Sequence, residues 1–145
     1  MIDQIENNDL SLTTGAKMFL KESAGWTKFI SIVGFVFIGF LIIIALFAGT
    51  FLGAMMEASG MNMMGGAFIT VFYLVIAVIN FFPIYYLFQF SSKMKAALQT
   101  QSSELLEQAF SNLKSHYKFM GILLIIVLGL YAIALIFGGL AAAMM

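Results

Sequence analysis

The sequence of 145 residues contains no cysteine, no arginine, one histidine and one proline. Without cysteine, the chain has no disulfide, no thiolate nucleophile and no cysteine-based zinc site. Without arginine, paired hydrogen bonds to phosphate or carboxylate groups are not expected, because only a guanidinium presents that rigid fork of donors. The formal net charge is zero, so nucleic acid is not an expected partner.

Charged residues are scarce and confined to parts of the chain. They make up 10% of the sequence, against about 25% in an average soluble domain. Apolar residues make up 62%, and the mean hydropathy is +1.02. Between Lys28 and Lys93 only Glu57 is charged at neutral pH, and after Lys118 no side chain is. Uncharged stretches of this length predict bilayer spans.

Three apolar runs are long enough to cross about 30 Å of hydrocarbon at about 1.5 Å per residue. Backbone polar groups inside lipid must pair within their own segment, so each run is expected to be a helix. The predicted fold is an all-α membrane protein with three transmembrane helices, at 29–52, 66–88 and 119–140. The other predicted segments are an acidic disordered tail (1–11), an amphipathic interfacial helix (12–28), an external Gly/Met loop (53–65), a cytoplasmic helical hairpin extending spans two and three (89–118), and an external tail (141–145).

The lysines predict the orientation of these spans. All seven lie before the first span or between the second and third. Lysine-rich segments stay in the cytoplasm. We therefore expect the N-terminus and the hairpin to be cytoplasmic, and the first loop and the C-terminus to lie outside.

Aromatic side chains and lysines gather where the predicted spans reach the cytoplasm. Aromatic rings favour the headgroup level, with lysines just beyond them. The predicted interface anchors are Trp26, Lys28, Tyr85, Tyr86, Lys93, Lys95, Tyr117 and Lys118.

The only proline, Pro83, lies about one turn inside this boundary. It leaves the carbonyl of Ile79 without its usual helical partner, and Asn80 is close enough to help satisfy freed backbone groups. We expect a fixed bend here in preference to a hinge, because static proline kinks are well tolerated in spans.

The predicted cytoplasmic pieces are helical. In residues 16–30 one arc, including Trp26, is apolar and the lysines lie opposite, so this helix is expected to lie on the inner leaflet. Thr13 or Thr14 is its expected N-cap, and Gly25 is the expected turn into the first span.

The hairpin is expected to form by extension of spans two and three. QTQSS (99–103) ends the first arm, and Ser102 or Ser103 caps a second arm that continues into the third span. The side chains expected to pack between the arms are Phe90, Met94 and Leu98 on one arm and Leu106, Phe110 and Leu113 on the other.

Small residues recur every four positions in spans one and three, a spacing that lets helix backbones approach closely. It fits contacts within one chain and contacts between chains equally. The predicted helix-packing residues are Ala45, Gly49, Gly53, Ala134, Gly138 and Ala142.

No spacing in the sequence matches a catalytic or metal site, so we expect no enzyme, no catalytic residue and no cofactor. The lone His116 is interpreted as a packed or interfacial side chain. The external loop holds five methionines, whose thioethers are a ligand type for Cu(I). The favoured interpretation is a low-complexity loop without a metal site.

Three stretches carry a family resemblance: W-x-x-F at 26–29, FFP-x-YYL at 81–87 and LK-x-H-Y-K-F at 113–119. Together they resemble a family of small bacterial membrane proteins of unknown function, over residues 12–137. The resemblance implies a bacterial inner membrane and no established activity.

Two functions remain. The first is a non-enzymatic accessory or scaffold protein, which forms a homo-oligomer or binds another membrane protein. The alternative is a small oligomeric channel or transporter, in one version for metal ions through the Met-rich loop.

Overall fold

The computed structural model describes residues 11–60 and 64–143, which form three long helices. They are α2 (Thr14–Ala58), α3 (Met64–Thr100) and α4 (Ser103–Ala143). Each is long and apolar enough to cross a membrane, which indicates a multi-pass membrane protein. The predictions for the acidic tail up to residue 10, for Met61 and Met63, and for the last two residues of the C-terminal tail lie outside the described residues.

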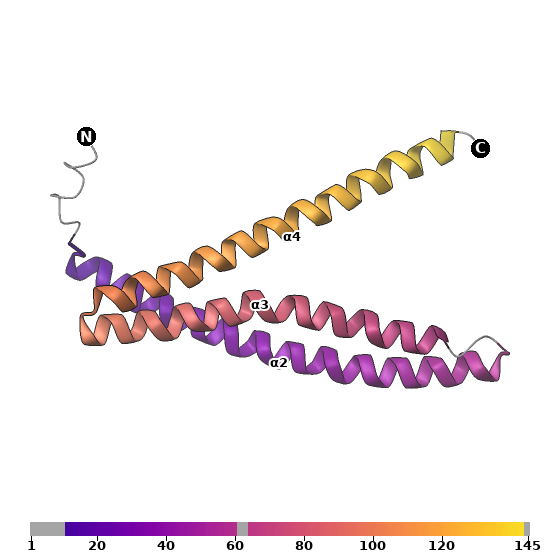
Figure 1. Ribbon diagram of the computed structural model, residues 1–145, viewed down its shortest axis with the longest axis horizontal. Coiled ribbons are helices and arrows are strands. Elements are labelled where there is room, and N and C mark those ends of the chain that lie inside the picture. Colours follow the sequence, from indigo (N-terminus) through magenta and orange to yellow (C-terminus); the bar gives the residue numbers. More distant parts are fainter. Residues whose placement is uncertain (1–10, 61–63, 144–145) are drawn as a thin grey trace.

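The three helices do not form an even bundle (Figure 1). α2 and α3 run antiparallel, side by side along most of their length, and α4 contacts α3. α4 lies close to α3 only near the turn that joins them and then diverges, so its C-terminal half stands apart. We call the end of the molecule with the α3–α4 turn the hairpin end, and the opposite end of the α2–α3 pair the loop end.

The helix starts have the caps that the sequence predicts. Thr13 accepts a hydrogen bond from the backbone N–H of Ala16 at its side-chain oxygen, at 3.2 Å. The Ser102 hydroxyl oxygen accepts one from the N–H of Leu105, also at 3.2 Å. Between α3 and α4, Gln101 has a φ of 54°. This left-handed residue ends α3 and lets the chain reverse.

The N-terminal segment differs from the prediction, because no separate interfacial helix forms. α2 passes Gly25 without a break, so residues 14–28 continue directly into the first span. A glycine inside a helix costs only about 1 kcal/mol relative to alanine. Ala24, directly before this glycine, is fully buried, and its carbonyl accepts a hydrogen bond from Ser91 of α3, so α2 is held against α3 at this point.

The predicted loop 53–65 is also shorter than expected. α2 extends to Ala58, since residues 54–58 contain no helix breaker. The helix ends at Ser59, and the following Gly60 has a φ of 75° and donates its N–H to the carbonyl of Glu57 at 3.1 Å. That conformation favours glycine, so the first clear stop signal is Gly60.

The largest buried cluster lies at the hairpin end, where all three helices meet. Its members are Ala24 from α2, Phe90 and Met94 from α3 and Ala109 from α4, surrounded by Leu20, Leu98, Leu106 and Leu113. The two hairpin arms thus pack on each other, and α3 also packs on α2. The apolar arc predicted for residues 16–30 is only partly buried. Leu20 packs against this core, whereas Phe19 and Trp26 are 71% and 63% exposed.

Candidate functional site

The contact face of α2 repeats every seven residues. Its buried side chains include Ala24, Ser31, Ile38 and Ala45. Facing them, Ser91 and Ala77 of α3 are fourteen residues apart and are buried too. A seven-residue repeat keeps one stripe of a helix against its partner, and small side chains allow a short interhelical distance. The sequence contains this seven-residue repeat, but the prediction of packing residues used only small residues at every fourth position and so did not identify it.

A buried hydrogen bond fixes the register of this helix pair at the hairpin end. The Ser91 hydroxyl donates to the carbonyl of Ala24 at 2.8 Å, and both residues are fully buried. Further along, a Cβ added to Gly34 would lie 2.8 Å from the Ile84 side chain. Gly34 is a close-approach position that the sequence analysis missed.

The closest backbone approach lies at the loop end. A Cβ on Gly66 would lie 2.5 Å from the Gly49 carbonyl oxygen and 2.6 Å from Gly53 Cα. Thr70 lies in the same contact. Its hydroxyl lies 3.1 Å from the carbonyl oxygen of Gly66 in its own helix and 3.3 Å from that of Ala45 across the helix pair, and it shares its one proton between them. The predicted helix-packing residues of the first span therefore contact α3 of the same chain.

The matching stripe in α4 has a different environment. Ala134 is exposed, and a Cβ on Gly138 would meet nothing within 4 Å. The side chain of Ala142 is not among those described. Every residue from Leu124 to Leu140 is exposed. We call residues 124–140 the free half of α4.

The separation of α4 from α3 begins near Pro83. His116 Nδ1 lies 2.9 Å from the Pro83 carbonyl oxygen, and the rings of Phe82 and Phe119 are 6.0 Å apart. A carbonyl can only accept, so Nδ1 carries the proton of this hydrogen bond. His116 therefore joins the two helices, in keeping with a packed role. The Asn80 side chain donates to the carbonyl of Ile76 at 2.8 Å, and not to the Ile79 carbonyl that Pro83 frees, as the sequence had suggested.

The predicted interface anchors lie on all three helices. Trp26 is exposed and meets Phe29 edge to face, with ring centroids 6.3 Å apart. The Lys28 ammonium lies 6.0 Å from the centroid of the Phe88 ring, which places these two residues at one height. Of the other anchors, Tyr85, Tyr117 and Lys118 are exposed, and Tyr86, Lys93 and Lys95 are half-buried.

Polar side chains within the spans bond mainly to backbone carbonyls. The Thr50 hydroxyl donates to the carbonyl of Leu46 at 2.9 Å, one turn back in its own helix. Thr70 and Asn80 donate to backbone carbonyls as described above. Within residues 11–60 and 64–143, no group of three or more His, Cys, Asp or Glu side chains is placed so that it could hold a metal ion. These polar groups thus serve helix geometry and helix packing.

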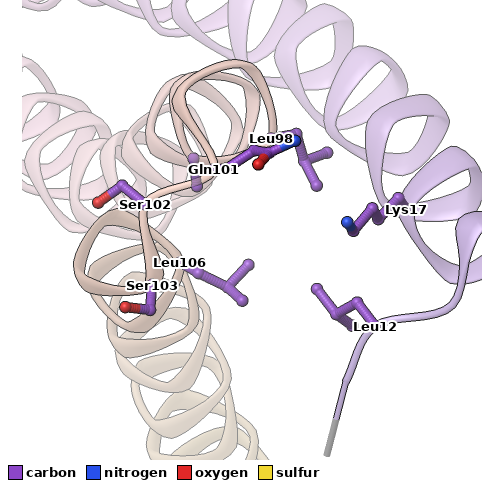
Figure 2. Close-up of a pocket in the computed structure, with 8 residues that line it drawn as sticks. Leu12, Lys17, Leu98, Gln101, Ser102, Ser103 and Leu106 are labelled. Atoms are coloured by element: carbon purple, nitrogen blue, oxygen red, sulfur yellow. The ribbon is translucent and has the colours of Figure 1, made fainter.

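Two adjoining cavities lie between α2 and the hairpin. One, of about 370 Å³, has apolar walls from Leu12, Leu98 and Leu106. Figure 2 shows the Lys17 ammonium pointing into this cavity, whereas the hydroxyls of Ser102 and Ser103 point away from Lys17. The second cavity, of about 270 Å³, is lined by Lys21, Lys95, Leu98 and Gln99.

The long apolar helices and the close packing of α2 on α3 define the class: a multi-pass membrane protein with three candidate spans. The chain belongs to a family of unknown function, DUF5362, whose match covers residues 49–139, more than half of its length. Comparisons with curated proteins and with solved structures gave no match.

Proposed function

We propose that the protein is a non-enzymatic accessory or scaffold subunit of a bacterial inner membrane. In this proposal the free half of α4 binds a transmembrane helix that lies outside its own fold. The observation that carries the proposal is the exposure of every residue from Leu124 to Leu140. The N-terminus and hairpin end are assigned to the cytoplasm, because all seven lysines lie before the first span or between the second and third.

The comparison between the two small-residue stripes supports this assignment. Lipid tails are as apolar as leucine, so helices in a bilayer associate through tight contact. The Gly49 stripe is already engaged with α3. The Gly138 stripe has the same spacing, and open space surrounds Gly138. A second helix can approach α4 there without displacing any contact within the chain.

The side-chain chemistry supports a binding role over an enzyme or a channel. The one histidine is engaged with the backbone of α3, and Thr50, Thr70 and Asn80 donate to backbone carbonyls. The sequence also lacks the spacings that catalytic groups need.

Cysteine cross-linking in native membranes tests the proposal. Because the sequence contains no cysteine, an introduced cysteine is the only thiol of the chain that can react. Gly138→Cys is expected to form a cross-linked product with a short reagent that joins a thiol either to an amine or to another thiol. Ile136→Cys is the matched control, because it lies about 160° round the helix from Gly138 and only about 3 Å away along the axis. A product of doubled mass identifies a second copy, and any other mass identifies another protein for mass spectrometry. If Gly138→Cys gives no product, or no more than Ile136→Cys, the proposal is wrong.

A further inference from the structure

Two lysines from different helices line one cavity at the hairpin end. Lys21 of α2 and Lys95 of α3 both border the cavity of about 270 Å³, together with Leu98 and Gln99. The hydrogen bond between Ser91 and Ala24 sets this register. Lys21 lies three residues before Ala24 and Lys95 four residues after Ser91. In an antiparallel pair, these two positions come face to face.

A third lysine extends the same groove. Lys17 lies four residues before Lys21, which places both on one face of α2. It borders the adjoining cavity, which shares Leu98 with the first, and its ammonium points into that space (Figure 2). Among the described residues, neither cavity is lined by an aspartate or a glutamate. Three lysines therefore border the two cavities, and the positive potential there attracts an anion.

The height of the groove relative to the lipid selects the kind of anion. Trp26 is exposed, as a side chain at the membrane–water interface is expected to be. Lys21 lies five residues further out, about 7.5 Å along the helix axis. The headgroup layer of one leaflet is about 5–8 Å thick. The lysine pair therefore lies at the level of the headgroups, and the inner leaflet carries anionic lipids.

We propose that the cavity between α2 and α3 that Lys21 and Lys95 border binds the headgroup phosphate of an anionic phospholipid. The site is separate from the free half of α4, and it stands whether or not that surface binds a partner. Leu98 forms its apolar wall and is shared with the adjoining cavity, which Lys17 borders.

Native mass spectrometry of the detergent-solubilised protein tests this proposal by titration with phosphatidylglycerol and, separately, phosphatidylcholine. The wild-type protein is expected to bind phosphatidylglycerol more tightly. The double variant Lys21→Gln/Lys95→Gln is expected to bind it about thirty-fold more weakly. This factor follows from the loss of about 1 kcal/mol for each ion pair between a lysine and the bound phosphate, at 1.4 kcal/mol per tenfold.

The matched control is Lys114→Gln/Lys118→Gln, which removes the same charge from α4, away from both cavities. It is expected to change the affinity less than threefold. Equal losses in the two double variants would mean general surface attraction and would overturn the proposal. The proposal would also be overturned if the wild-type protein bound phosphatidylglycerol no more tightly than phosphatidylcholine. This comparison needs no variant. Displacement of the lipid by millimolar inorganic phosphate would identify free phosphate as the ligand and would overturn the assignment to lipid.

Discussion

Gly66→Ala is expected to weaken the α2–α3 pair more than its size suggests. Non-bonded carbon atoms prefer about 3.5–4.0 Å, whereas the new Cβ would lie 2.6 Å from Gly53 Cα and 2.5 Å from the Gly49 carbonyl oxygen. Both neighbours are backbone, so no side chain can rotate away. The helices have to separate locally by about 1 Å, which forfeits a quarter to a half of the contact energy across the gap.

The expected loss of stability is about 2 kcal/mol. Overpacking costs about 1–3 kcal/mol, and the helix preference of alanine offsets up to about 1 kcal/mol of this. Loss of the contact between Thr70 and the Ala45 carbonyl adds little, because the Thr70 hydroxyl keeps its hydrogen bond to the Gly66 carbonyl. For a chain of this size the midpoint of thermal unfolding in detergent should fall by roughly 4–8 °C. Gly138→Ala is the control, because its Cβ meets nothing and alanine favours the helix by about 1 kcal/mol. A Gly66→Ala protein as stable as the wild type, or an equal loss in Gly138→Ala, would refute this reasoning.

Other expectations concern the hairpin end and the orientation. Met94→Ala should cost about 2–5 kcal/mol, because Met94 is fully buried at the centre of the core, and thermal unfolding in detergent measures it. Ser91→Ala should cost about 1 kcal/mol through loss of the hydrogen bond to Ala24. If the variant unfolded thermally at the same midpoint as the wild type, this bond would contribute nothing to stability. A reporter active only in the periplasm should be active when fused after Met145 and silent when inserted at Gln101, and the opposite pattern would reverse the topology.

The three helices were predictable because each apolar run is long and uncharged. The caps were predictable too, since Thr13 and Ser102 stand directly before helical stretches. The continuity of α2 through Gly25 was not. Glycine permits a turn and also tolerates a helix, and the outcome depends on contacts between α2 and α3 that local sequence does not contain.

The burial of particular faces was only partly predictable. In residues 16–30, Leu20 and Trp26 share the apolar arc, yet Leu20 packs toward the core and Trp26 is exposed. Likewise, the Gly49 and Gly138 stripes have the same spacing but only the first is occupied. A helix that is apolar on every side gives no periodic signal for its contact face. The seven-residue recurrence from Ala24 to Ala45 was the available signal for the α2–α3 seam.

Because α4 is held by contacts at one end only, a small rotation at that end produces a larger displacement at the other end. The contacts that hold it end near His116 and Phe119, and the free half beyond them extends about 25 Å at 1.5 Å per residue. A rotation of about 10° at the hairpin end would move the far end of this arm by more than 4 Å, about the width of a methyl group. Small rearrangements at the hairpin end are thereby magnified at the far end of α4. Distances between spin labels near the far ends of α3 and α4 would measure this displacement directly.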